Sequence, residues 1–173
     1  KFWNDKKDKK FKEAYFNRFS NTWHHGDFAE IKKTRGFVIH GRSDTTLNPG
    51  GVRLGTAEIY SEVEKFREIK ESIVVGQSWN NDVRIVLFIV MNRKFYPTED
   101  LLKKIKIQIR KNASPRHVPS KVIVVNDIPR TKSGKIVELA VKNTIEGNNI
   151  KNKEALANPK ALEQFKNLKE LSN

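Results

Sequence analysis

Two apolar, β-branched runs joined by a short polar turn constrain the fold of this 173-residue chain more than any other feature. Residues 69–75 and 83–90 are rich in Ile and Val, and the turn between them contains Asn80, Asn81 and Asp82. Runs of this length and composition around such a turn predict a β-hairpin. Because both runs are strongly apolar, we expect the hairpin to lie in the core of a domain.

The segments around the hairpin predict helices and one further strand. Thr56 and Thr98 are each expected to cap a helix, since a Thr side chain can accept a hydrogen bond from the first turn. The helices are expected at 56–66, 98–111 and 136–145, and the third strand at 121–125. This order predicts a small α+β domain with a short sheet of about three strands covered by helices.

Further elements are expected on either side of this domain. They are a short amphipathic helix within 2–19, strands at 22–25 and 36–40 around a polar turn at 32–35, and a final amphipathic helix from Asn158-Pro159. The two strands predict a second β-hairpin, which we expect to belong to a different domain.

The segment Pro129–Ile136 places a proline, two hydroxyl residues, a glycine and three cations between apolar segments. Such a loop is positive and rich in donors, and it suits the placement of one lysine against an anion. It is not a P-loop, because Pro129 occupies the first glycine position and Ile136 replaces the Ser or Thr.

The formal net charge of +14 indicates a polyanionic ligand, a nucleic acid or simply well-solvated helix faces. The lysines are spread over 6–12, 103–111 and 151–169, and no nucleic-acid module with interleaved aromatic residues is present. Nucleic acid is therefore the weaker explanation, and we expect no nucleic-acid partner. A nucleotide or coenzyme A remains as a polyanionic ligand.

Cysteine is absent, which excludes disulfides and cysteine-ligated zinc. His24 and His25 are adjacent, so a strand would direct them to opposite faces, and we expect no metal site. No apolar run approaches the roughly 18 residues of a membrane span, and residues 1–10 lack the apolar core of a signal peptide. We expect a cytoplasmic chain without a membrane partner.

Three segments together resemble the acyl-adenylate-forming enzymes, the superfamily of acyl-CoA synthetases, peptide-synthetase adenylation domains and luciferases. Residues 23–27 are similar to their Gly-Asp motif, 41–59 to their hinge motif and 129–136 to their lysine loop. The order and spacing also agree, and the resemblance covers nearly the whole chain. Within the superfamily, residues 46–60 and 155–162 are most similar to the acetoacetate–CoA ligases.

The resemblance implies a reaction in which acetoacetate and ATP, accompanied by Mg2+, form acetoacetyl-AMP, from which coenzyme A displaces AMP. It also implies three parts: 1–43 as the end of a large N-terminal domain, 44–146 as a mobile C-terminal lid and 147–173 as a helical extension. The phosphate loop and the acyl pocket of the family are expected in the rest of the N-terminal domain. We therefore expect these 173 residues alone to be inactive.

The resemblance assigns the nucleotide and the catalytic step to three residues. Lys135 matches the catalytic lysine, which contacts the carboxylate and the α-phosphate as they join and offsets the charge of the transition state. Asp27 matches the aspartate that accepts the ribose hydroxyls of ATP, and Arg42 matches an arginine that also contacts the ribose.

The remaining roles concern the movement of the lid and the second substrate. Asp44 matches the hinge, where a few residues absorb a large change of φ and ψ. Gly51 matches the glycine that lines the thiol tunnel, and Arg53 matches the arginine that stabilises the active arrangement. Arg110 stands where an arginine touches the nucleotide of coenzyme A.

Two alternatives remain open. One keeps the chemistry and changes the acid to acetate or another short chain, since the acyl pocket is expected outside these residues. The other is a non-catalytic basic domain that binds nucleic acid or a polyanionic partner surface.

Overall fold

A computed structural model describes residues 2–150 and 152–172. Residues 1, 151 and 173, which fall within the expected parts 1–43 and 147–173, lie outside the described residues. The chain divides into two compact units: unit 1 comprises Lys1–Ser43 and unit 2 comprises Asp44–Asn173.

Unit 2 is built on a mixed three-stranded sheet of β3 (Ile69–Trp79), β4 (Asp82–Met91) and β5 (Lys121–Val124). Strands β3 and β4 pair antiparallel, and β4 and β5 pair parallel. Asn80 and Asn81 connect β3 to β4 with φ of 49° and 59°, the left-handed conformation that tight hairpin turns require. The predicted core hairpin and the α+β class are confirmed.

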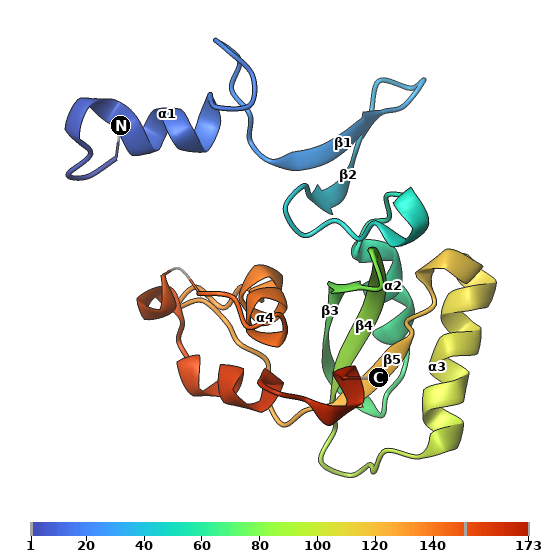
Figure 1. Cartoon of the computed structure of the whole chain (residues 1–173). Helices are drawn as coiled ribbons and strands as arrows, with labels where there is room; N and C mark the ends of the chain where they lie inside the picture. Colours follow the sequence, from blue (N-terminus) through green and yellow to red (C-terminus); the bar gives the residue numbers. More distant parts are fainter. Residues whose placement is uncertain (1, 151, 173) are drawn as a thin grey trace. The chain divides into compact units, whose positions relative to one another are not determined.

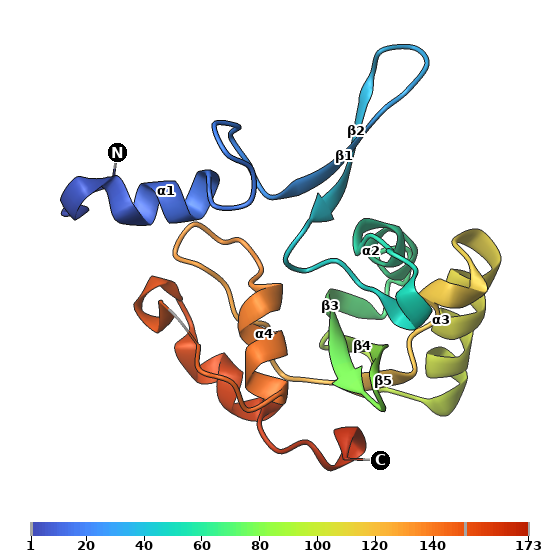
Figure 2. The same cartoon turned by 45° about the horizontal axis from the view of Figure 1, so that its top comes forward.

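Helices and loops cover both faces of this sheet (Figures 1 and 2). One face packs against α2 (Ala57–Val63) and α3 (Glu99–Asn112). The other face packs against α4 (Glu138–Ile145) and the C-terminal segment. Since each strand buries side chains on both sides, the runs are almost continuously apolar rather than alternating.

The two cores alternate along each strand. Ile73 and Val75 lie in the core under α4, whereas Val74 between them lies in the core under α2 and α3. The members of the core under α4 that come from the sheet, with Val125 just after β5, are Ile73, Val75, Val86, Phe88, Val90, Ile123 and Val125. Those on the opposite face are Ile69, Val74, Ile85, Leu87 and Ile89.

The two predicted threonine caps have different outcomes. Thr98 Oγ1 accepts a hydrogen bond from the backbone N–H of Leu101 at 3.1 Å, so the cap of α3 is confirmed. Thr56 makes no such bond, because its own φ and ψ are already helical and its side chain cannot reach forward as a cap requires. The cap expected at Thr56 is therefore wrong.

Side chains cover the free edge of β3. The hydroxyl of Tyr60, on α2, accepts from the N–H of Val74 at 3.1 Å and donates to Glu138 of α4. Farther along the strand, Glu146 accepts from the backbone and hydroxyl groups of Ser78 at 3.0 and 2.9 Å. Edge groups satisfied in this way cannot pair with another chain.

The C-terminal segment forms 3-10 turns instead of the predicted amphipathic α-helix. These turns are Lys153–Ala155, Pro159–Phe165 and Lys169–Leu171. The second turn ends at Lys166, whose backbone is extended, and Asn167 follows with a positive φ of 50°, so no continuous helix forms. The apolar residues Leu156, Leu162, Phe165 and Leu171 are buried in the core under α4, so this segment shares the core of unit 2.

Two more 3-10 turns of unit 2, Pro49–Gly51 and Pro115–His117, precede α2 and follow α3. Arg84 ties β4 to the last turn of the chain, donating to Gln77 at 2.8 Å and to the Leu171 carbonyl at 2.6 Å.

Unit 1 contains a 3-10 turn (Lys6–Asp8), α1 (Lys9–Tyr15) and a two-stranded antiparallel hairpin of β1 (Asp27–Ile31) and β2 (Phe37–Arg42). The strand expected at 22–25 is wrong. Trp23 stacks on Tyr15 at 3.9 Å between ring centroids, so the aromatic character of this segment serves packing against α1. In the part of the chain that the structure describes, no helix has the length and hydropathy to span a membrane.

We expect Phe165→Ala to lower the free energy of unfolding by about 3–5 kcal/mol, because it leaves a cavity in a packed core. Phe165 is fully buried, and its ring meets that of Phe88 edge-on at 4.9 Å between centroids. Chemical denaturation of the chain followed by circular dichroism measures the change. Tyr96→Ala is the control, since Tyr96 is 83% exposed in the same unit. Equal effects of the two substitutions would contradict a core role for Phe165.

Candidate functional site

Asp27 and Arg42 face each other across the hairpin of unit 1. They are paired positions, Asp27 at the start of β1 and Arg42 at the end of β2. The Arg42 Nη1 atom lies 3.7 Å from Asp27 Oδ1 and donates to the His25 carbonyl at 3.1 Å. His25 Nδ1 contacts the other carboxylate oxygen of Asp27. The structure therefore joins the two residues predicted to contact a ribose.

Gly26 is the position where the hairpin and the arginine approach most closely. Its φ of +91° suits glycine, and a Cβ atom there would lie 3.1 Å from Arg42 Nη2. The Gly26 carbonyl also accepts from the N–H of Ser43 at 2.8 Å. A glycine before Asp27 thus leaves room for the guanidinium beside the carboxylate.

The predicted lysine loop is a tight reversal of the chain with Lys135 exposed on it. Arg130 and Ile136 form an antiparallel bridge, and the N–H of Thr131 donates to the Lys135 carbonyl at 2.9 Å. Thr131 Oγ1 in turn accepts from the N–H of Lys135 at 3.1 Å. Gly134 makes the reversal possible with φ of +83°. The backbone of Lys135 is held while its side chain reaches into solvent.

The predicted glycine turn lies at the other face of unit 2. Gly50 and Gly51 have positive φ values of 58° and 76°, and no atom lies within 4 Å of a Cβ built on Gly51. The N–H of Gly50 donates to the carboxylate of Asp82 at 2.8 and 3.0 Å, which fixes the turn to the β3–β4 hairpin. The space beside Gly51 is open to a ligand.

Arg110 is exposed in the last turn of α3, and Arg116 follows in the next turn of the chain. Arg116 Nη1 lies 3.7 Å from where a Cβ of Gly50 would be, so the end of α3 and the glycine turn are neighbours. Figure 1 shows both at one end of the sheet, while the loop before α4 lies on the opposite face. The structure thus groups Gly51 with the end of α3 and separates Lys135 from them.

The remaining predicted residues are Asp44 and Arg53. Asp44 is the first residue of unit 2, directly after the boundary between the two compact units. Arg53 is exposed just after the glycine turn.

The residues that anchor the lysine loop were not expected from the sequence. Asn158 accepts from the N–H of Arg130 at 2.8 Å and donates to Asp127 and the Ile128 carbonyl at 2.6 and 2.9 Å. The proline after Asn158 indicates a helix start and gives no sign of a partner 28 residues away.

Three buried or bonded groups have displaced pKa values for different reasons. Burial raises the pKa of the Tyr60 phenol well above its usual value, and the Glu138 carboxylate adds to the effect. Hydrogen bonds from Lys65 and Asn112 lower the pKa of Glu62. Burial lowers the pKa of His117, against the opposing effect of Glu58. Both shifts favour the neutral forms of Tyr60 and His117.

In the ranges 2–150 and 152–172, no group of three or more His, Asp or Glu side chains is placed to hold a metal ion.

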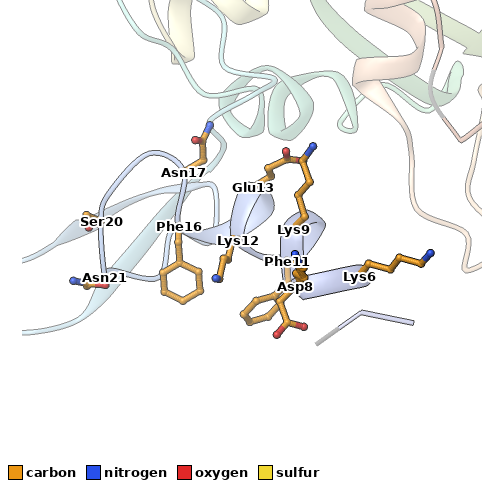
Figure 3. A pocket seen from close by; sticks show the side chains of 11 residues that line it. Lys6, Asp8, Lys9, Phe11, Lys12, Glu13, Phe16, Asn17, Ser20 and Asn21 are labelled. Carbon is orange, nitrogen blue, oxygen red and sulfur yellow. The ribbon is translucent and has the colours of Figure 1, made fainter. Parts of the chain in front are cut away.

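A hollow of about 800 Å³ lies beside α1 in unit 1 (Figure 3). Phe11 and Phe16 line it with their rings directed the same way, and Lys6, Lys9 and Lys12 are also among its lining residues. None of the predicted site residues lines this hollow, so we assign it no role in the proposed chemistry.

Comparison with known proteins agrees with the motifs. Residues 58–135 match the family model of the AMP-binding enzyme C-terminal domain. The chain is 59% identical over 172 residues to acetoacetyl-coenzyme A synthetase from Rhizobium meliloti (strain 1021), which covers 99% of this chain and 26% of the relative. It is 47% identical over 174 residues to acetoacetyl-CoA synthetase from Xenopus tropicalis, with the same coverage of 99% and 26%.

A solved structure gives the same result for the fold. Acetoacetyl-CoA synthetase from Streptomyces lividans superposes with a TM-score of 0.89 at 36% identity, covering 100% of this chain and 26% of that one. The chain therefore spans about a quarter of the length of the relatives that it matches.

Proposed function

We propose that this chain is the C-terminal part of an acetoacetate–CoA ligase, a proposal supported by the match of residues 58–135 to the AMP-binding enzyme C-terminal domain. The ligase forms acetoacetyl-CoA from acetoacetate, ATP and coenzyme A through acetoacetyl-AMP. The observation that carries the proposal is the 59% identity over 99% of the chain to an acetoacetyl-coenzyme A synthetase.

Asp27 and Arg42 are proposed to hold the ribose of ATP. A carboxylate can accept two hydroxyl donors at once, which matches the paired hydroxyls of a ribose. The nearby Arg42 guanidinium, 3.7 Å from Asp27, helps to orient the carboxylate. Asp27 begins β1 and Arg42 ends β2, and the two are paired across the hairpin. The hairpin therefore fixes their separation before the nucleotide binds.

Lys135 is proposed to stabilise the transition state in which the acetoacetate carboxylate attacks the α-phosphate of ATP. Its ammonium group offsets the negative charge that spreads over the phosphate oxygens, and it forms no covalent bond. The exposed position of Lys135 on a fixed backbone suits a side chain that must enter a site made largely by another domain.

Gly51, Arg53 and Arg110 are proposed to serve the second step, in which coenzyme A displaces AMP. The open space beside Gly51 admits the narrow pantetheine arm, and Arg110 pairs with the phosphates of its nucleotide. Arg53 supports the arrangement in which this step occurs. Because Gly51 and Lys135 lie on opposite faces of unit 2, one unit presents each face in turn by rotation at Asp44.

The proposed enzyme requires the large N-terminal domain that these 173 residues do not contain. Residues 1–43 are proposed as its last segment, 44–146 as the lid and 147–173 as the extension, and the chain alone is proposed to be inactive. Mg2+ arrives with ATP, and no residue of this chain is assigned to it. The enzyme is proposed to act in the cytoplasm, without nucleic acid or membrane as partners.

Lys135→Ala in the full-length gene product is expected to reduce acetoacetate-dependent exchange of pyrophosphate into ATP by about 100- to 1,000-fold, because one transition-state donor is lost. Lys132→Ala is the matched control, since Lys132 is exposed on the same loop. A comparable loss with Lys132→Ala would contradict the assignment of Lys135. Exchange that depends on acetate but not acetoacetate would change the acid, and no acid-dependent exchange by the wild type would overturn the ligase.

Gly51→Leu is expected to slow the coenzyme A step by about 100-fold while leaving pyrophosphate exchange within about twofold, because the side chain fills the path of the pantetheine. Release of AMP from preformed acetoacetyl-AMP on addition of coenzyme A measures this step. Gly147→Leu is a matched control, since Gly147 has a similar φ of +70° and an equally open Cβ position. Equal defects in the two variants would indicate backbone strain rather than a blocked path.

A further inference from the structure

The two arms of the lysine loop and part of the C-terminal segment form a three-segment arrangement, with the first arm in the middle. The first arm, residues 129–132, pairs on one side with the arm that carries Lys135. On the other side it pairs with residues 155–157 of the C-terminal segment, through an antiparallel bridge between Thr131 and Leu156. The N–H of Lys132 donates to the Ala155 carbonyl at 3.0 Å, and the N–H of Ala157 donates to the Arg130 carbonyl at 2.8 Å.

The side chain of Asn158 closes this arrangement at the base of the loop. Its Oδ1 accepts from the N–H of Arg130, and its Nδ2 donates both to Asp127 Oδ2 and to the Ile128 carbonyl. One amide thereby satisfies groups at 127 and 128, just before the arm that pairs with Lys135, and at 130 within that arm. The residues at the N-terminal base of the loop are thus bonded by one side chain from a distant segment.

Two further features make this anchor rigid. The guanidinium of Arg130 contacts Glu71 on β3, lies 3.4 Å from Asp127 and donates to the Ile128 carbonyl at 3.0 Å. The segment that carries Asn158 is itself fixed, because Leu156 before it and Leu162 after it are buried in the core under α4. Loss of the Asn158 side chain would therefore leave the segment in place and release the loop.

We propose that Asn158 is a positioning residue for Lys135: through the amide and carbonyl groups of residues 127–130, it sets where the lysine loop stands on unit 2. This inference rests on the proposed function, in which Lys135 acts only while acetoacetate joins the α-phosphate. The connection runs through consecutive hydrogen bonds, from Asn158 to Arg130, and from the arm of Arg130 and Thr131 to Ile136 and Lys135. A shift of about 1 Å in a catalytic group can reduce a rate by about 100-fold.

The C-terminal segment supplies a matched control in Gln164. Its Nε2 donates to the Asp127 carbonyl at 2.7 Å, and its Oε1 accepts from the N–H of Asn126 at 2.7 Å. Gln164 thus ties the same segment to the same connection with bonds of similar length. It does not bond residues 129–132, which form the arm paired with Lys135.

The test compares Asn158→Ala with Gln164→Ala in the full-length gene product. Asn158→Ala is expected to lower the kcat of acetoacetate-dependent pyrophosphate exchange by about 10- to 100-fold with KM for ATP within about threefold. The coenzyme A step from preformed acetoacetyl-AMP should stay within about twofold of wild type. Gln164→Ala is expected to leave both steps within about twofold.

Hydrogen exchange of the same proteins gives a readout that does not depend on activity. The amides of Arg130 and Lys132 should exchange faster in Asn158→Ala than in wild type and at the wild-type rate in Gln164→Ala. Of the two substituted side chains, Asn158 bonds this arm and Gln164 does not.

Each outcome decides the inference. Equal losses of both steps in Asn158→Ala, or equal losses in the two variants, would indicate a general structural role and overturn it. A wild-type rate of acetoacetate-dependent pyrophosphate exchange in Asn158→Ala would also overturn the inference. A wild type without acetoacetate-dependent exchange would instead overturn the proposed function, whereas faster amide exchange at 130–132 would still report that Asn158 holds the loop.

Discussion

The burial of the β3–β4 hairpin on both faces is the constraint on which unit 2 depends. Adjacent residues such as Ile73 and Val74 enter different cores, so each strand must be covered from two sides at once. The chain meets this requirement with α2 and α3 on one face and with α4 and the C-terminal turns on the other. The glycine turn and the lysine loop are consequently attached to opposite faces, which gives one small domain two distinct surfaces.

The lysine loop and the C-terminal segment depend on the same core. Leu156 and Phe165 bury apolar surface beside α4, and the backbone between them meets the loop through residues 155–158. Apolar burial stabilises the folded C-terminal segment, and the hydrogen bonds from this segment fix the position of the loop. The segment that follows α4 is thus part of the structure that supports the predicted catalytic residue.

Local signals in the sequence were sufficient where structure follows from neighbouring residues. The core hairpin, its Asn80-Asn81 turn and the Thr98 cap all depend on residues within a few positions, and each was predicted. The strand expected at 22–25 was wrong because the aromatic Trp23 packs on Tyr15 instead of entering a sheet.

Contacts between distant residues could not be predicted in this way. The pairing of Asp27 with Arg42 depends on the register of a hairpin that begins later than expected, and the bond from Asn158 to Arg130 spans 28 residues. Likewise, apolar residues at helical spacing after Asn158 suggested an α-helix, although 3-10 turns bury them as well. The resemblance to known motifs predicted residues such as Lys135, whereas residues that hold them in place, such as Asn158, are evident only in the folded structure.

The held backbone of the lysine loop has a consequence for conformational entropy. Fixing a residue of a flexible loop costs about 1–2 kcal/mol in backbone entropy, so ordering all eight residues at the moment of reaction would be a large penalty. Here Thr131, Gly134 and Lys135 are already bonded within the loop, and Arg130 and Lys132 are bonded to the C-terminal segment. For Lys135 itself, whose backbone is bonded, the rotatable bonds of the side chain remain to be ordered, at about 2 kcal/mol. Most of the entropy loss therefore occurs during folding, before any substrate is bound.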